Sequence, residues 1–128
     1  DPFEVWGDGE QIRNWTYVDD IVSGTIAAAE NINDGTSVNL GTMERVKVKG
    51  CANQVIETLN PGAQIKLLTN KPTGPLNRVA SNALAKELLN WEPKTDFAGG
   101  LQRTIQWYIK SKTTEQASTD LTRKLVGR

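Results

Sequence analysis

The sequence predicts an α/β domain in which helices pack on short strands. Two kinds of segment support this fold class. In short segments apolar and polar residues alternate, and in longer segments apolar residues recur at helical spacing. These segments follow one another along a chain of 128 residues, which is long enough to bury a core within one domain.

The first third of the chain predicts two strands and a helix. Residues 3–6 alternate and stop at Gly7-Asp8-Gly9, and residues 12–18 are again rich in strand-forming side chains. Asp19 or Asp20 can then cap a helix that ends at Asn33-Asp34-Gly35. The apolar positions of this helix are Ile21, Val22, Thr25, Ile26, Ala28, Ala29 and Ile32.

The middle of the chain alternates between strands and a helix. Residues 37–40 predict a strand closed by Gly41, and residues 65–68 predict another. Between them, residues 47–59 predict a helix, although Gly50 weakens it by about 1 kcal/mol relative to alanine. Residues 71–75 predict a loop because they are rich in proline and glycine.

The last third predicts two helices. Ser81 can cap the first, which runs to Asn90 and is broken at Trp91-Glu92-Pro93. The second covers residues 97–112, with Leu101, Ile105 and Ile109 on its apolar face. We therefore expect one lobe over residues 1–112 and a C-terminal tail, helical or frayed, over residues 113–128.

Composition excludes several classes of function. Fifteen Lys and Arg balance fifteen Asp and Glu, so nothing favours nucleic-acid binding. Histidine is absent and Cys51 is the single cysteine, which excludes histidine-based catalysis, an internal disulfide and a cysteine-cluster metal site. No apolar run approaches the ~18–20 residues that span a bilayer, and no signal peptide is recognisable. We expect a cytoplasmic protein without a membrane partner or a metal.

Two short patterns share residue types and spacing with a cofactor motif and a catalytic motif, but not their sequence context. Gly7-x-Gly9 begins like a dinucleotide fingerprint, but Ile12 stands where the third glycine belongs and no helix is predicted after it. Tyr108 and Lys112 have the Y-x-x-x-K spacing, which puts both on one helical face near the end of the chain. No dinucleotide-binding unit precedes them, so we predict neither a catalytic residue nor a bound cofactor in this chain.

Arg13 is the most informative side chain. It is a lone cation after an acidic, glycine-rich turn, and two aromatic residues, Trp15 and Tyr17, follow it. A guanidinium fork matches phosphate oxygens, and a planar ring beside it suits a ribose or a base. The alternative is a surface ion pair with a nearby carboxylate, for which the candidates are Asp8, Glu10 and Asp19.

Three segments occur in a diagnostic order. Residues 5–20 read VWGDGEQIRNWTYVDD, and residues 38–41 read VNLG. Residues 78–108 contain RVAS, LLNWEPKT and GLQRTIQWY. In order and spacing these segments resemble the extended short-chain dehydrogenase/reductase family, the NAD(P)-dependent nucleotide-sugar epimerases and dehydratases. Its patterns run roughly V-Y/W-G-D-G-x-Q-x-R-x-F-x-Y-V-x-D, Y-N-x-G, R-x-x-D, L-G-W-x-P and G-L-x-x-T-I-x-W-Y.

The resemblance implies that this chain is the C-terminal, substrate-binding lobe of such an enzyme. It also implies that the Rossmann domain is absent, and with it the bound NAD or NADP and the catalytic Tyr and Lys. It implies that a nucleotide-diphosphate sugar binds here and that Arg13 and Arg78 hold its diphosphate. Trp15 would lie beside the diphosphate, and Ser81 replaces an aspartate that contacts the ribose or supports the arginine. Glu4, Val5 and Trp6 would lie along the base.

Two functions remain open. In the first, the chain is the nucleotide-sugar-binding part of an NAD-dependent epimerase or dehydratase (an isomerase or a lyase) and has no catalysis of its own. In the second, it is a binding or scaffold module that keeps the fold. In the family, the strand matching residues 38–40 joins the Rossmann sheet. We therefore expect an exposed apolar face that is covered by a Rossmann domain or by a second copy in a homo-oligomer such as a dimer.

Overall fold

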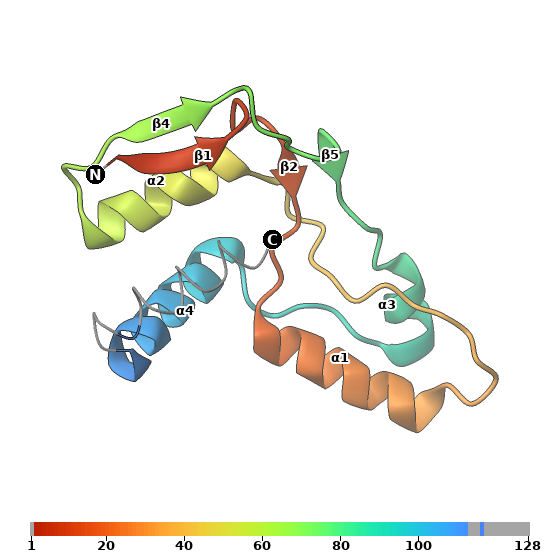
Figure 1. Cartoon of the computed structure of the whole chain (residues 1–128). Helices are drawn as coiled ribbons and strands as arrows, with labels where there is room; N and C mark the ends of the chain where they lie inside the picture. Colours follow the sequence, from red (N-terminus) through yellow and green to blue (C-terminus); the bar gives the residue numbers. More distant parts are fainter. Residues whose placement is uncertain (1, 113–115, 117–128) are drawn as a thin grey trace.

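The structure, a computed structural model, describes residues 2–112 and Gln116, and these form two small sheets and four helices (Figure 1). This mixed architecture confirms the predicted α/β class. The tail expected at 113–128 lies, apart from Gln116, outside the described residues. In chain order the elements are β1 (Phe3–Trp6), β2 (Ile12–Arg13), α1 (Val18–Asn31), β3 (Val46–Lys47), α2 (Val48–Leu59), β4 (Ile65–Leu68), β5 (Asn77–Arg78), α3 (Ala83–Leu89) and α4 (Phe97–Ser111).

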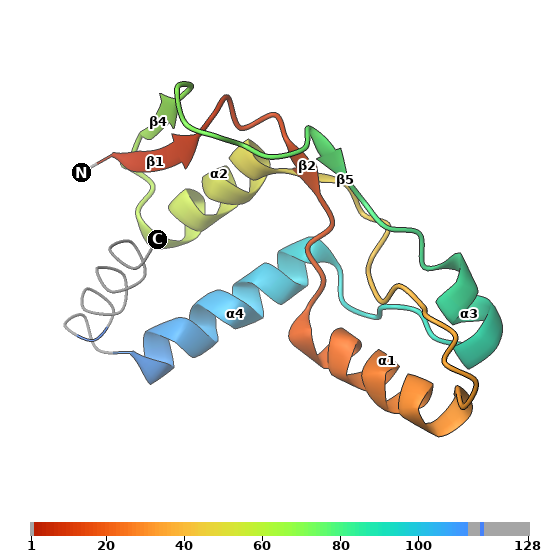
Figure 2. The same cartoon turned by 45° about the vertical axis from the view of Figure 1, so that its right-hand side comes forward.

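The first sheet pairs β1 with β4 in parallel, in a register that runs from Phe3 opposite Ile65 to Trp6 opposite Leu68. A parallel pair needs a crossover, and α2 supplies part of it by packing along β1 (Figure 2). Val5 is the buried residue of β1, and Ala52 and Ile56 are the buried residues of α2.

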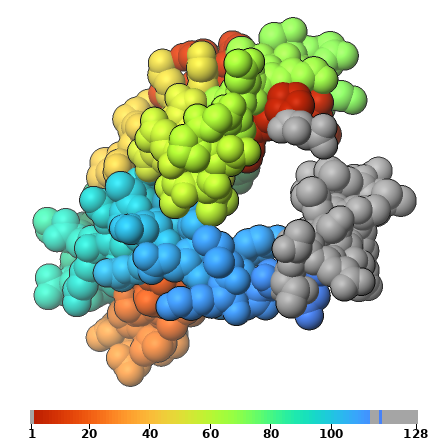
Figure 3. Space-filling model, turned by 90° about the vertical axis from the view of Figure 1, so that its left-hand side faces the viewer, coloured from red at the N-terminus to blue at the C-terminus, as the bar shows by residue number. Residues whose placement is uncertain are grey.

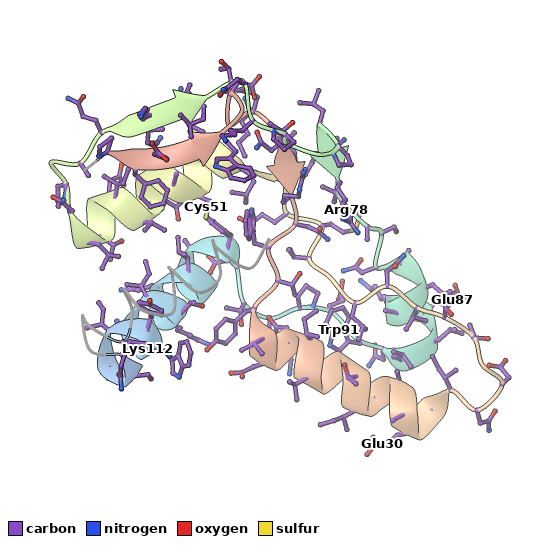
Figure 4. All side chains as sticks on the ribbon, in the orientation of Figure 1. Glu30, Cys51, Arg78, Glu87, Trp91 and Lys112 are labelled. Carbon is purple, nitrogen blue, oxygen red and sulfur yellow. The ribbon has the colours of Figure 1, made fainter. Side chains whose placement is uncertain are left out.

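The second sheet has the order β3-β2-β5, with β2 antiparallel to β3 and parallel to β5. Beyond it, α1 and α3 pack together, and Trp91 lies between them (Figure 4). Gly24 of α1 permits this close approach, because a Cβ there would come within 2.9 Å of the indole of Trp91. Ala85, Trp91, Phe97 and Ile105 form the buried apolar residues of this helical part.

Two of the expected strands are wrong: one is shorter than expected, and the other does not form. The strand expected over 12–18 ends at Arg13, because side chains replace the ladder after it. Asn14 Nδ2 donates to the Thr42 carbonyl (3.1 Å), and the Thr42 amide donates to Thr16 Oγ1 (3.0 Å). The strand expected over 37–40 does not form, since no described strand lies beside it to supply ladder hydrogen bonds.

The helix ends also differ in detail from the expectation. Tyr17 is the N-cap of α1, so neither Asp19 nor Asp20 caps it. Asn82 is the N-cap of α3, while Ser81 Oγ accepts from the Ala83 amide at 3.3 Å. Asp96 caps α4 by accepting from the Gly99 amide at 3.0 Å. Within the described ranges, no helix combines the length and the apolar character needed to cross a bilayer.

Candidate functional site

Arg13 and Arg78 lie directly opposite each other on neighbouring parallel strands, β2 and β5. Side chains alternate between the two faces of a sheet, so residues in register on parallel strands point to the same face. Neighbouring strands are about 4.8 Å apart, which fixes the separation at which the two side chains start. The two arginines that the sequence singles out are therefore adjacent in the structure.

Backbone carbonyls hold the guanidinium of Arg13. Nη1 donates to the carbonyls of Ile12 (2.7 Å) and Pro75 (2.8 Å), and Nη2 donates to that of Thr73 (3.2 Å). The ion pairs considered for Arg13 do not form. Glu10 instead accepts from Lys47 Nζ at 2.6 Å, which raises the pKa of Lys47.

Arg78 is exposed, and its side chain has no hydrogen bond or ion pair with any residue that the structure describes. Figure 4 shows it beside β2, at the side of β5 that is nearer the helical part. Ser81 follows three positions later in the chain and is also exposed, with its hydroxyl engaged at the start of α3. The arginine pair thus carries two positive charges and lacks a carboxylate within 4.0 Å among the described residues.

The residues expected along a base lie on the other sheet, in β1. Val5 is only 4% exposed, and Glu4 accepts from Lys66 Nζ at 3.0 Å. Trp6 is 45% exposed, and Lys71 Nζ lies 5.7 Å from the centroid of its ring. Lys71 belongs to the same loop as Thr73, so this loop connects the surroundings of Trp6 to those of Arg13.

Trp15 lies elsewhere, in an apolar cleft of about 760 Å³. Its ring centroid is 6.5 Å from that of Phe97, and neither Arg13 nor Arg78 lines the cleft. Figure 3 shows the surface hollowed between α2 and α4. The main apolar lining residues are Trp15, Tyr17, Cys51, Phe97, Leu101 and Trp107.

Cys51 faces this cleft from the side of α2 that is turned toward α4 (Figure 4). It is half-buried, and burial raises the pKa of its thiol. A thiol of raised pKa is a poor nucleophile at neutral pH, which fits the interpretation of Cys51 as an apolar packing residue. The described part of the chain contains no cluster of three acidic or cysteine side chains that could hold a metal ion.

The turn at Gly7-Asp8-Gly9 does not fit a dinucleotide cofactor. Gly7 and Gly9 adopt φ values of 82° and 75°, and the turn joins strand β1 to strand β2. A dinucleotide fingerprint instead leads from a strand into a helix, whose N-terminus receives the pyrophosphate. Tyr108 and Lys112 lie at the far end of α4, remote from the arginine pair (Figure 4).

Sequence reasoning missed the residues that hold Arg13. Residues 71–75 were expected to form a loop, and they do, but their carbonyls at Thr73 and Pro75 bind the guanidinium. Every residue carries a backbone carbonyl, so residue type gives no signal for such a contact. The Pro/Gly composition of the loop was the available clue, because it indicates a tight chain reversal.

Comparisons with known proteins identify the family of the chain. The family model for GDP-mannose 4,6 dehydratase matches residues 1–104. UDP-glucuronic acid decarboxylase 1 of Arabidopsis thaliana is 38% identical over 104 residues, covering 81% of this chain and 24% of that protein.

Solved structures of nucleotide-sugar epimerases are also similar to this chain. UDP-glucuronic acid 4-epimerase of Bacillus cereus, in complex with UDP-glucuronic acid and NAD, is similar with a TM-score of 0.70 and 29% identity over 79% of this chain and 33% of that one. UDP-glucose 4-epimerase of Thermotoga maritima, with UDP-glucose, has a TM-score of 0.74 and 28% identity over 87% and 36% of the two chains.

The chain spans between 24% and 36% of the length of these three proteins. The match to the family model covers residues 1–104 of the 128 in the chain. The chain therefore belongs to the GDP-mannose 4,6 dehydratase family, within the extended short-chain dehydrogenase/reductases that act on nucleotide sugars.

Proposed function

We propose that this chain binds the diphosphate of a nucleotide sugar and serves as the substrate-binding part of an NAD-dependent epimerase or dehydratase. One observation carries the proposal: Arg13 and Arg78 are in register on one face of a sheet, with no carboxylate beside them among the described residues. An anion with several oxygens is the ligand that such a pair recognises best.

The charges favour a doubly charged ligand. The two side chains start on strands about 4.8 Å apart, and like charges at about 5 Å repel each other by about 1 kcal/mol even in water, and more where solvent is excluded. A diphosphate removes this repulsion and accepts hydrogen bonds from both forks. Each such charge-assisted bond contributes about 1.5–3 kcal/mol. Binding through this part of the ligand would fix the position of the sugar without contacting the reacting carbon.

The base is proposed to lie along β1, on the side of Trp6. Trp6 offers an exposed ring, and within the described residues β1 pairs only with β4. The Trp6 carbonyl already accepts a hydrogen bond from Gln11 Nε2 at 3.1 Å, so the ring is the part of Trp6 that would contact a base. Glu4 would act through its backbone, because its side chain is paired with Lys66. Val5, whose side chain is buried and which pairs with β4, would hold the strand in place beside the base. Relatives solved with UDP-sugars support a uridine nucleotide as the first ligand to test.

Trp15 and Ser81 are proposed as secondary contacts. Trp15, which lines the cleft and is 42% exposed, would pack beside the ligand from there. The Ser81 hydroxyl already accepts one hydrogen bond, but its own proton remains available for a ribose oxygen.

The NAD and the catalytic groups would come from outside the described residues, which offer no fitting dinucleotide turn. We propose that a Rossmann-type domain covers α1 in the working enzyme. Val18, Val22 and Ile26 are exposed at spacings of four, so they form one apolar stripe along this helix. The segment 37–40 has the strand pattern but no described ladder partner.

Isothermal titration calorimetry tests the binding proposal. UDP-glucuronic acid, UDP-glucose and GDP-mannose are titrated into the full chain and into Arg13→Ala and Arg78→Ala. Lys110→Ala is the control, because it also removes one positive charge but from the exposed end of α4, outside the cleft and away from the arginine pair. We expect the control to bind normally and both test variants to lose at least tenfold in affinity. A folded chain that binds none of the three ligands would favour the scaffold function instead.

A further inference from the structure

The loop between β4 and β5 is anchored on both sides of the β1–β2 turn. At its start, the Gly7 amide and the Lys71 amide both donate to the Leu68 carbonyl, at 2.8 and 3.0 Å. At its end, the Ile12 amide donates to the Leu76 carbonyl at 2.8 Å. Between these anchors the chain curves back so that two of its carbonyls face Arg13.

The carbonyls occupy only part of the guanidinium. An arginine carries five N–H donors in a fixed planar arrangement. Nη1 uses two on Ile12 and Pro75, and Nη2 uses one on Thr73. The Nε–H and one Nη2–H remain, on adjacent nitrogens, and this is the number that a bidentate contact with a phosphate requires.

The partners of Arg13 are neutral, and this matters for binding. A carboxylate in their place would cancel the charge of the guanidinium and compete with the ligand. Backbone carbonyls orient the group through their dipoles and leave its net charge in place. The arrangement reduces the freedom of a side chain that would otherwise lose much rotamer entropy on binding.

Two glycines allow the loop to take this path. Gly74 has φ +69°, and a Cβ on it would lie 3.7 Å from Arg13 Nη2. Gly7 has φ +82°, and a Cβ on it would overlap the methyl group of Thr73. A residue with a Cβ would be strained at either φ. At Gly7 its Cβ would also press on Thr73, whereas at Gly74 the added Cβ would make only ordinary contact with Arg13 and the strain would be relieved by a shift of the loop that carries the two carbonyls.

We propose that Thr73-Gly74-Pro75 is a positioning segment that fixes the Arg13 guanidinium with two donors free for a phosphate, so that the path of this loop sets the affinity for a nucleoside diphosphate. The proposal rests on the proposed function, since it concerns the same arginine. It adds residues that touch no ligand and act through Arg13.

Gly74→Ala in the full chain tests this proposal, with Gly35→Ala as the matched control. Gly35 has φ +81° and nothing within 4 Å of its added Cβ, so both variants strain the backbone alike but only one lies beside Arg13. We expect Gly74→Ala to raise the Kd for UDP roughly tenfold, and Gly35→Ala to leave it within about twofold. Unfolding in urea, measured in parallel, is expected to be similar for the two variants.

A double-mutant cycle separates positioning from a general loop effect. In an Arg13→Lys background, the carbonyls no longer orient a guanidinium, so Gly74→Ala is expected to add less than a twofold loss. Equal Kd values for Gly74→Ala and Gly35→Ala, or the same tenfold loss in both backgrounds, would overturn the proposal.

A readout without ligand distinguishes this proposal from the proposed function. In ¹⁵N NMR spectra, the Arg13 Nη protons are expected to show hindered rotation in the original chain and averaged signals in Gly74→Ala. Averaged signals in both proteins would overturn the positioning role. If the original chain binds no UDP but the hindered rotation is lost in Gly74→Ala, the proposed function fails while the hold of the loop on Arg13 stands.

Discussion

Asp20→Asn is expected to destabilise the fold by about 2–4 kcal/mol, because the Asp20 carboxylate joins two distant segments. Asp20 lies in the first turn of α1 and is 6% exposed. Its Oδ1 accepts from the Lys94 amide and its Oδ2 from the Thr95 amide, both at 3.0 Å. These amides lie just before α4, so one side chain ties the starts of two helices together.

The magnitude follows from the two hydrogen bonds. A hydrogen bond to a charged group contributes about 1.5–3 kcal/mol, and a buried N–H that loses its acceptor costs about 1–3 kcal/mol. Asparagine keeps one oxygen, so one bond survives in a weaker, neutral form. The NH₂ group of asparagine would face the other backbone amide, and because both are donors no hydrogen bond forms there. The sum is a large share of the roughly 5–15 kcal/mol that stabilises an ordinary domain.

Urea unfolding followed by tryptophan fluorescence measures the effect. Trp91 is a local reporter, because its indole N–H donates to the Asp20 carbonyl at 3.1 Å and to Ser23 Oγ at 3.0 Å. Asp19→Asn is the control: Asp19 is exposed in the same helical turn, so it removes the same charge from the helix N-terminus at about 0.3–1 kcal/mol. Equal midpoints and slopes for the two variants would refute the reasoning.

Three further predictions use related assays. Gly24→Ala should lower the urea midpoint, because the added Cβ would lie 2.9 Å from Trp91. Gly50→Ala should stabilise the fold by about 0.5–1 kcal/mol, because nothing lies within 4 Å of the added Cβ. The reverse order of the two midpoints would contradict the packing of Gly24. Trp91→Phe loses both indole hydrogen bonds and should cost about 1–2 kcal/mol, so an unchanged midpoint would contradict them. Burial raises the pKa of the Cys51 thiol, so iodoacetamide at alkaline pH should react more slowly with the folded chain than with the urea-unfolded chain, and equal rates would contradict the burial. The stability that the neutral thiol contributes should fall as the pH rises through its folded pKa.

Local patterns predicted the elements that depend on local chemistry. The helix expected over 47–59 is Val48–Leu59, and that expected over 97–112 is Phe97–Ser111. The strands at 3–6 and 65–68 also have the expected bounds, because glycine, asparagine and proline punctuate them. Residues 37–40 have an equally good strand pattern and form none. A strand exists only beside a partner, and a pattern in one segment carries no information about that partner.

The sequence predicted which residues form the candidate site, largely through the family resemblance, but not how they are arranged. The chemistry of the neighbouring residues pointed to Arg13 and the resemblance added Arg78, but no property of either residue reveals that they lie opposite each other on β2 and β5. Trp15 illustrates the opposite case. Trp15 is close to Arg13 in the sequence, and its ring packs near Phe97 in a cleft that neither arginine lines, so a contact with the diphosphate stays a prediction. Strand β2 ends at Arg13, so the strand pattern that would have placed Trp15 on the same sheet does not hold there.

The arginine register depends on more than its own ladder. Strands β2 and β5 are each two residues long, so few strand hydrogen bonds fix Arg13 opposite Arg78. The flanking contacts are the loop amides and carbonyls described above, together with the Asn14 and Thr42 hydrogen bonds that follow β2. Loosening these contacts would separate the arginines without changing either one. Affinity for a diphosphate and resistance to unfolding should therefore fall together in variants of the flanking residues, whereas Arg78→Ala should lower affinity alone, since its exposed side chain makes no described contact.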